Sequence, residues 1–363
     1  MNKNHARATL ILEDGSIFSG YSFGYQGTTD GEVVFNTGMV GYPETLTDPS
    51  YAGQILVITY PLVGNYGVPP KTYENSLLLN FESEKIQTKA LIVSDYSDEY
   101  SHWNADQSLG NWLESEKIPG IYGIDTRALT RKLRDNGTML GHIIQGDVVP
   151  EDDVAKEIVD PNKTDLVGSV CTKEVVEYEG GNTKIVLVDC GVKNNIIRAF
   201  QGRNITVVRV PYDYDFLSIE ADGIMISNGP GDPKMCEATI ANTKKAMEKN
   251  IPILGVCLGS QIIGLAAGMD TYKLKYGHRS LNQPVNEAGT NRSYITSQNH
   301  GYAVDAETLP LDWREWFTND NDGSNEGIIH ISKPFFGTQF HPEASPGPDD
   351  TEFIFDMFVR SLK

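Results

Sequence analysis

Cys257 stands where a nucleophile would be presented. It follows the apolar run PILGV and precedes SQIIGLAA, with Gly255 and Gly259 two residues away on either side. The spacing G-x-C-x-G is the cysteine version of the nucleophile elbow, in which a strained strand-to-helix turn lifts the side chain above a sheet. The helix N-terminus that follows favours a thiolate. The pattern predicts either a catalytic thiol or a buried cysteine beside an ordinary glycine turn, and by itself it leaves both open.

A candidate base and its orienting group lie late in the chain, in FFGTQFHPEASPG. Residues two apart share a face in extended backbone, so Glu343 can hold the His341 imidazole while the other ring nitrogen faces Cys257. This is the nucleophile, base and orienter arrangement of a catalytic triad. The alternative is a surface histidine at a strand end. A zinc deaminase would need a P-C-x-x-C motif after the H-x-E, and no cysteine follows His341, so we expect no metal site.

The loop NGPGDP, residues 228–233, follows the apolar run MIS. Glycine lets backbone N–H groups converge on an anion, and an acyl-transfer enzyme needs such donors for the oxyanion of its tetrahedral intermediate. No G-K-[ST] follows, so the loop is not a Walker A phosphate site. An ordinary turn is the other interpretation.

The bulk composition predicts a globular, cytoplasmic protein of two domains. The chain has 363 residues, of which 39% are hydrophobic and 22% charged. The net charge of -19 argues against nucleic acid and against an anionic membrane surface as partners. The four cysteines show no C-x-x-C spacing, and the N-terminal apolar patch is too short for a signal peptide or a membrane span.

The pattern of elements predicts an α/β fold in both halves. Residues 1–148 alternate short β-rich runs with glycine turns and contain helices at SLGNWLESE and after Asp125, so we expect a mixed α/β domain. Residues 149–183 lose this periodicity and read as a linker. Residues 184–363 repeat strand, turn and helix, which predicts a mostly parallel sheet covered on both faces, with its ligand at the carboxyl ends of the strands.

Four motifs in this order, NGPGDP, GVCLGSQ, QNHGYAVD and FHPEASPGP, resemble the class I (triad) glutamine amidotransferase domain. The first half, in GEVVFNTGMVGYPETLTDPSYAGQILVITYPLVGNYG and GIDTRALTRKLRDNGTM, resembles the small-subunit family of carbamoyl-phosphate synthetase. The similarity runs over nearly the whole chain.

The resemblance implies a role for each matching residue. Cys257 would be the nucleophile of a triad with His341 and Glu343, and the N–H groups of Gly229 and Leu258 would form the oxyanion hole. The glutamine pocket would be lined by Gly231, Gln261, Asn299, Gly301 and Tyr302, and Ser50 of the first domain would reach the α-amino or carboxylate end of the substrate.

Three positions depart from the family pattern. Ser260 replaces a usual histidine, Ser280 in HRSLN replaces a usual glycine, and Tyr302 replaces a common phenylalanine. All three leave the triad residues in place. His278 of the same HRSLN motif is a further candidate for the rim of the pocket.

The implied activity is glutamine hydrolysis through a γ-glutamyl thioester on Cys257, as the glutaminase half of a ligase. Ammonia becomes ammonium in neutral water, so it would need a sealed path to the next active site. The sequence shows no Walker A motif and no evident ATP-binding loop, so the chain itself would hold no cofactor. ATP and magnesium would bind to a large subunit, which makes carbamoyl phosphate from bicarbonate for pyrimidine or arginine synthesis, in a heterodimer that forms higher oligomers.

Two other function classes use the same fold. One is a non-catalytic interaction subunit, for which Ser260 would be a sign of drift. The other is an independent cysteine hydrolase acting on γ-glutamyl peptides, which leaves the first domain without a purpose. The presence of Cys257, His341 and Glu343 together favours the glutaminase subunit.

Overall fold

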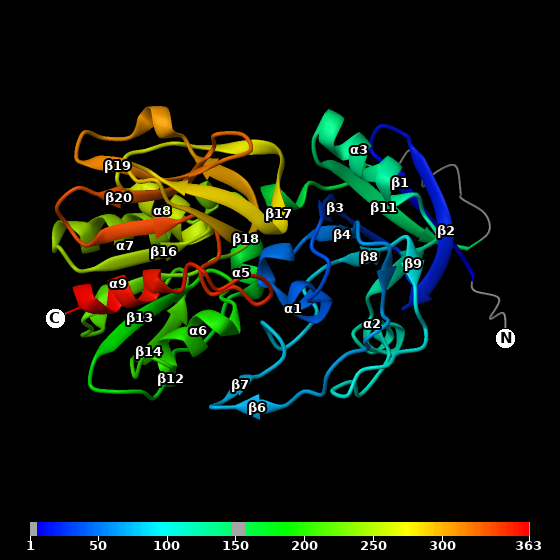
Figure 1. The fold of residues 1–363 in the computed structure, drawn as a ribbon, viewed down its shortest axis with the longest axis horizontal. Helices are drawn as coiled ribbons and strands as arrows, with labels where there is room; N and C mark the ends of the chain where they lie inside the picture. The colour runs from blue at the N-terminus through cyan, green and yellow to red at the C-terminus, as the bar shows by residue number, and fades with distance from the viewer. Residues whose placement is uncertain (1–5, 147–156, 363) are drawn as a thin grey trace. The chain divides into compact units, whose positions relative to one another are not determined.

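The computed structural model describes residues 6–146 and 157–362 (Figure 1). The chain forms two compact units, one comprising the chain up to Glu74 with Leu78–Thr164, the other Asn75–Leu77 with Asp165–Lys363. The units divide inside the segment 149–183 that we predicted as a linker, of which residues 149–156 lie outside the described residues. Every helix in the described part of the chain is too short or too polar to cross a membrane.

A closed barrel of strands forms the centre of the first unit. Its strands, in their order around the barrel, are β1 (Arg7–Leu12), β11 (Met139–Gln145), β3 (Thr29–Asn36), β4 (Gln54–Ile58), β8 (Ala90–Ile92), β10 (Pro119–Tyr122) and β2 (Ile17–Gly24). The pairs from β3 through β4 and β8 to β10 are parallel, and the remaining pairs are antiparallel. Closure pairs every strand on both sides, so this sheet has no exposed edge. The sequence predicted a mixed α/β domain but not the closure of its sheet.

Short helices and strands make up further parts of residues 42–136, of which Leu77 belongs to the second unit. They are α1 (Tyr42–Thr47), η1 (Pro49–Tyr51), α2 (Leu109–Ser115), α3 (Thr126–Asn136), β5 (Leu62–Val63), β6 (Tyr73–Glu74), β7 (Leu77–Leu78) and β9 (Asp95–Tyr96). The predicted start of α3 is confirmed, because the Asp125 side chain accepts a hydrogen bond from the Ala128 N–H at 2.9 Å. Gly137 ends the helix.

A ten-stranded sheet among the described residues organises the second unit. Its order is β12 (Val176–Tyr178), β14 (Thr206–Pro211), β13 (Lys184–Asp189), β15 (Gly223–Ile226), β16 (Ile253–Val256), β21 (Phe335–Thr338), β20 (Asn325–His330), β19 (Trp313–Asn319), β17 (Thr271–Glu287) and β18 (Ser293–Val304). The strands from β14 to β21 are parallel, as predicted. The sequence did not predict the antiparallel extension from β20 to β18, in which β17 and β18 pair with shifts in register.

Helices cover both faces of the parallel strands (Figure 1). They are α5 (Leu166–Val170), α6 (Asn194–Gln201), α7 (Glu237–Glu248), α8 (Leu258–Ala266) and α9 (Phe353–Ser361), with the short turns η3 (Phe216–Ser218), η4 (Pro233–Met235) and η5 (Ala306–Thr308). The short turn η2 (Pro161–Lys163) belongs to the first unit. Alternate residues of β13 show the two faces: Ile185 and Leu187 pack with α6 and α9, whereas Val186 and Val188 pack with α7 and α8. Burial on both faces explains why these strands read as nearly continuous apolar runs.

Part of the predicted linker belongs to the second unit. The helix α5 and the strand β12 lie within residues 165–183, and Val167 and Tyr178 are buried there. The two elements have five and three residues. Elements this short give too little periodicity to be recognised from sequence.

Cys257 occupies the sharp turn between β16 and α8. Its backbone is at φ 54° and ψ -108°, a conformation that residues other than glycine rarely adopt. The two flanking glycines permit a close crossing of chains: a Cβ on Gly259 would lie 2.0 Å from the Ile226 carbonyl oxygen, and one on Gly255 would lie 2.5 Å from the Gly259 backbone. The predicted elbow is therefore present, and both glycines are needed for backbone contact.

We predict that Gly259→Ala destabilises the protein by about 1–3 kcal/mol, because the added methyl group overlaps a carbonyl that is fixed in the sheet. Gly264→Ala, in the same helix, is the control: the nearest atom to its Cβ would be in the Val304 side chain at 3.2 Å, and its three nearest neighbours are all side-chain atoms. Urea unfolding followed by tryptophan fluorescence measures both variants. Equal unfolding midpoints for Gly259→Ala and Gly264→Ala would contradict this account of the elbow.

Candidate active site

The ends of adjacent strands bring together the residues predicted to form a triad. Val256, the last residue of β16, pairs with Thr338, the last residue of β21, and the Cys257 N–H donates to the Thr338 carbonyl at 2.7 Å. His341 follows three residues after β21, and its N–H donates to the Ser297 carbonyl at 2.9 Å. The order of strands in the sheet thus places two residues that are distant in sequence at the same edge.

His341 and Glu343 form a short hydrogen bond inside the protein. Nδ1 of His341 lies 2.6 Å from Oε1 of Glu343, and the two residues are 2% and 1% exposed. Burial lowers the pKa of His341, but the Glu343 carboxylate together with Cys257 outweighs this effect and raises it to about 10. Nε2 of His341 has no hydrogen-bond partner with standard geometry among the described residues. His341 is thus a cation at neutral pH, positioned beside the Cys257 sulfur.

Lys193 is a functional candidate that sequence analysis missed. Its ammonium lies 3.1 Å from Glu343 Oε1 and donates a short hydrogen bond to the Ala344 carbonyl, and its side chain is 3% exposed. Burial raises the pKa of Glu343, but the charges of Lys193 and His341 outweigh it and bring that pKa to about 2. The signal available in the sequence was the polar run KNN, which follows the strand KIVLVD after the three residues CGV.

The loop after β15 lies against the elbow. A Cβ on Gly229 would fall 2.0 Å from the Cys190 carbonyl oxygen and 2.9 Å from the Leu258 side chain, so only glycine fits between them. Leu258 begins α8, where N–H groups lack partners within the helix. Gly231 follows in the same loop at φ 84°, against Leu166. The Leu258 side chain therefore lies next to Gly229, and the role of their N–H groups as an oxyanion hole stays a prediction.

The residues expected in the glutamine pocket occupy two places. Asn299 offers its backbone carbonyl 3.7 Å from the Cys257 sulfur, and the Tyr302 carbonyl, beyond Gly301 in β18, accepts a 2.9 Å hydrogen bond from Gln261 Nε2. Ser50 is buried in η1 of the first unit, where its N–H donates to the Asp48 carboxylate at 2.9 Å. The roles of these residues in substrate binding stay predictions.

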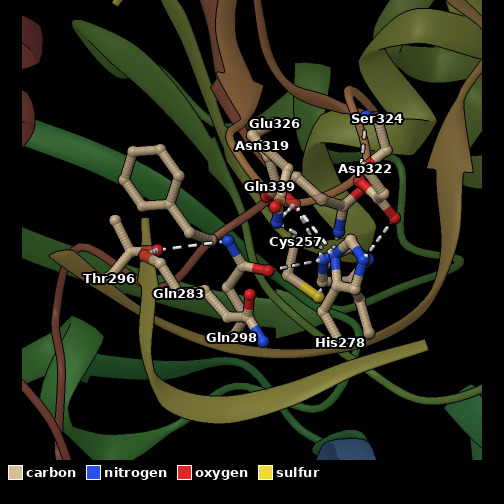
Figure 2. A network of polar contacts seen from close by, with 12 residues as sticks. Cys257, His278, Gln283, Thr296, Gln298, Asn319, Asp322, Ser324, Glu326 and Gln339 are labelled. Atoms are coloured by element: carbon tan, nitrogen blue, oxygen red, sulfur yellow. Dashed lines mark hydrogen bonds and ion pairs between the residues drawn. The ribbon is translucent and has the colours of Figure 1, made fainter. Parts of the chain in front are cut away.

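His278 lies inside a buried polar network rather than at a pocket rim (Figure 2). Its Nε2 lies 2.9 Å from Asp322 and its Nδ1 lies 3.1 Å from Glu326. Burial lowers the pKa of His278, whereas hydrogen bonds from the ring to Asp322 and Glu326 raise it to about 9. Hydrogen bonding to His278 in turn holds the pKa of Asp322 well below its usual range. At neutral pH the network therefore contains an imidazolium between two carboxylates.

The same network contains three side chains with metal-binding atoms, His278, His300 and Glu326, whose ligand atoms lie within 4.8 Å of one another. The Asn319 amide competes for this space. Its Oδ1 accepts from the Asn321 N–H at 2.9 Å, so its Nδ2 is the group that donates to Glu326 at 3.1 Å. A donor aimed at the shared carboxylate oxygen suits a proton network and opposes a cation.

The two halves of the chain match two known families. Residues 186–361 match the family "Glutamine amidotransferase class-I", and residues 10–143 match "Carbamoyl-phosphate synthase small chain, CPSase domain". The "Carbamoyl phosphate synthase arginine-specific small chain" of Neosartorya fischeri is 47% identical over 99% of this chain and 80% of its own length. The chain belongs to the carbamoyl-phosphate synthase small-chain family.

Longer relatives contain the same small chain as one part. "Multifunctional protein pyr1-3" of Dictyostelium discoideum is 48% identical over 99% of this chain but only 17% of its own length. "Carbamoyl-phosphate synthase [ammonia], mitochondrial" of Mus musculus is 49% identical over 98% of this chain and 24% of its own length. The chain thus spans a small part of these relatives, and the name of the mouse protein specifies ammonia.

For this small chain we predict that Glu343→Gln lowers kcat/KM for glutamine by about 10²–10⁴-fold, because the imidazole loses the charge that keeps it protonated. The pKa of His341, raised to about 10 by Glu343 and Cys257 against burial, should fall toward its ordinary 6.5. The alkaline limb of the pH–rate profile should therefore move down.

The control is Glu177→Gln, which removes a half-exposed carboxylate 3.4 Å from Lys184. It should leave the pH–rate profile unchanged. An alkaline limb at the same pH in Glu343→Gln and the unaltered protein would show that Glu343 does not set the charge of His341.

We further predict that Asp322→Asn lowers the urea midpoint at pH 6 and that the deficit shrinks above pH 9. Folding raises the pKa of His278 from 6.5 to about 9, because the ring is paired with Asp322 and Glu326. The protonated ring therefore stabilises the folded state fully below pH 6.5, and this stabilisation is lost as the pH rises through 9. Asp312→Asn, which removes an exposed partner of His330 at 3.1 Å, is the control. A deficit that stays constant from pH 6 to 10 would exclude this linkage.

Proposed function

We propose that this chain is the glutamine-hydrolysing subunit of a carbamoyl-phosphate synthase. The observation that carries the proposal is a cysteine on a strained elbow beside a buried His341–Glu343 pair. Family membership alone leaves the nitrogen donor open, because the mouse relative has ammonia in its name. A soft nucleophile with a base and an orienting carboxylate is what hydrolysis of an unreactive amide needs.

In the reactive form of the site the Cys257 proton already resides on His341 Nε2, so an imidazolium stands beside a thiolate. The thiolate attacks the γ-carboxamide carbon of glutamine, a C–S bond forms, and the carbonyl electrons move to an oxygen that faces the N–H groups of Gly229 and Leu258. As this oxyanion collapses, the C–N bond breaks and the imidazolium of His341 protonates the departing nitrogen, which leaves as ammonia. Water, deprotonated by His341, then hydrolyses the thioester to glutamate and restores the thiol.

Lys193 and Glu343 act on this cycle through charge. The imidazolium must persist until the leaving nitrogen takes its proton, and the Glu343 carboxylate holds it in that state. Lys193 keeps Glu343 ionised although the carboxylate is fully buried. Both therefore serve as positioning residues for His341.

The glutamine pocket follows from the family resemblance. We assign Gly231, Gln261, Asn299, Gly301 and Tyr302 to contacts with the substrate, and Ser50 to its α-amino or carboxylate end. The Oε1 atom of Gln261 is buried without a hydrogen-bond partner among the described residues, which leaves it available as an acceptor for a substrate donor.

The remaining chemistry belongs to a partner. We propose a large subunit that binds ATP and magnesium, receives the ammonia through a closed path, and combines it with bicarbonate to give carbamoyl phosphate. The heterodimer would assemble further into a higher oligomer. Four free thiols fit a reducing compartment, for which we propose the cytoplasm.

The decisive experiment is Cys257→Ser in the reconstituted complex with the large subunit. We expect glutamine-dependent synthesis of carbamoyl phosphate to be lost and ammonia-dependent synthesis to be retained, because only the first needs the thiolate. Cys171→Ser is the matched control and should keep both activities, since Cys171 lies at the end of α5 with its sulfur 3.8 Å from the Gly168 carbonyl.

Two outcomes would replace the proposal. Retention of glutamine-dependent synthesis in Cys257→Ser would indicate a non-catalytic interaction subunit. Faster hydrolysis of γ-glutamyl peptides than of glutamine by the unaltered chain, without binding to a large subunit, would indicate an independent hydrolase.

A further inference from the structure

Gln339 reaches the sulfur of the nucleophile. Its Nε2 lies 3.6 Å from Cys257 Sγ, and the residue, between β21 and His341, is 1% exposed (Figure 2). A second hydrogen bond joins Sγ to the Asn299 backbone carbonyl at 3.7 Å. A carbonyl oxygen can only accept, so the thiol donates to Asn299 and the sulfur is left to accept from Gln339.

The orientation of the Gln339 amide follows from its neighbours. The Tyr302 carbonyl accepts from the side chain of Gln261 at 2.9 Å, so the atom of Gln261 at that position is Nε2. The same nitrogen lies 2.9 Å from the Gln339 side chain, which must therefore present its oxygen there. The other end of the Gln339 amide, the NH2 group, then faces the sulfur. The amides of Gln261 and Gln339 thus form a chain of hydrogen bonds with fixed direction between the Tyr302 carbonyl and the sulfur of Cys257.

We propose that Gln339 is a catalytic residue whose amide N–H donates to the Cys257 thiolate and so keeps the nucleophile charged and aimed, with Gln261 as its positioning residue. The inference deepens the proposed glutaminase function and concerns the same site. Gln261 then has two functions. Its Nε2 orients Gln339 by a hydrogen bond, and its Oε1 remains available to the substrate.

A buried thiolate needs such a donor. Cys257 is 2% exposed, so water cannot solvate the charge that forms when His341 takes the proton. The Asn299 carbonyl accepts a hydrogen bond from the thiol and repels the thiolate, because its oxygen has a partial negative charge. The Gln339 amide N–H donates a hydrogen bond to the sulfur and so stabilises the thiolate. The Asn299 contact thus favours the protonated sulfur and the Gln339 contact favours the ionised sulfur. The protonation state of Cys257 therefore depends on Gln339.

The experiment titrates the thiolate itself in the full chain. Absorbance at 240 nm is followed against pH, and the same curve for Cys257→Ala is subtracted, so that tyrosines and other thiols cancel. Gln339→Met fills the same space without a donor, and we expect the midpoint of thiolate formation to rise by about one pH unit, since a hydrogen bond to a charged group is worth about that much. Gln339→Glu keeps the shape but adds like charge, and should raise the midpoint further.

Two further variants separate donation from packing. Gln283→Met is the control, because Gln283 on β17 bonds Asn321 at 2.8 Å and does not contact the sulfur. Its midpoint should equal that of the unaltered protein. Gln261→Met should raise the midpoint by less than Gln339→Met, and the double variant should shift no further than Gln339→Met alone, since Gln261 acts through Gln339.

Enzyme kinetics provide an independent readout. The acid limb of the kcat/KM profile for glutamine should move up with the thiolate midpoint in Gln339→Met, whereas a merely structural loss would lower the rate at every pH. If glutamine is hydrolysed and the midpoint stays in place in Gln339→Met and Gln339→Glu, the role of Gln339 is refuted and the proposed function stands. If the midpoint moves and the unaltered chain hydrolyses no glutamine, the proposed function fails and the role of Gln339 stands.

Discussion

A buried row of alternating charges is the interaction on which the site depends. It runs from the Lys193 ammonium to the Glu343 carboxylate and the His341 imidazolium, and it ends beside the sulfur of Cys257. Each charge would be costly alone in this interior, because burial removes the water that would solvate it. Each becomes tolerable because its neighbour carries the opposite sign. Removing one member therefore changes the proton affinity of the others.

The sheet makes this row possible by its strand order. Residues on β13, β15, β16 and β21 reach the same edge because the strands are parallel and adjacent, so the segments that follow them meet. Lys193 follows β13, Gly229 follows β15, Cys257 follows β16 and His341 follows β21. Glycines let these segments cross closely, because a Cβ on Gly229 or Gly259 would lie only 2.0 Å from a neighbouring carbonyl oxygen. The chemistry thus depends on packing that only glycine allows.

Side-chain amides supply hydrogen bonds at the nucleophile in addition to the charges. Gln261 and Gln339 form a chain of hydrogen bonds from the Tyr302 carbonyl to the sulfur. The network around His278 meets this chain at the Tyr302 carbonyl, which also lies 2.9 Å from His300 Nδ1, and it links the strands β17, β19 and β20. In the first network each amide has a single permitted orientation, because it ends at a carbonyl. A low-dielectric interior strengthens such fixed dipoles and penalises any that lack a partner.

The sequence by itself determined the chemistry and the local turns. The glycines around Cys257, the H-P-E spacing, the NGPGDP loop and the Asp125 cap each depend on neighbours within a few residues, so local patterns were enough to predict the elbow, the His341–Glu343 pair and the helix start. Long apolar runs likewise revealed the parallel strands.

The tertiary structure decided what depends on residues far apart in sequence. Lys193 lies 150 positions before Glu343, and Gln339 lies 82 positions after Cys257, so no local period could connect them. Barrel closure and the antiparallel half of the second sheet depend on which strands pair, and α5 and β12 are too short to show a period. His278 looked like a rim residue because its partners, Asp322 and Glu326, come from a loop and a strand more than forty residues away.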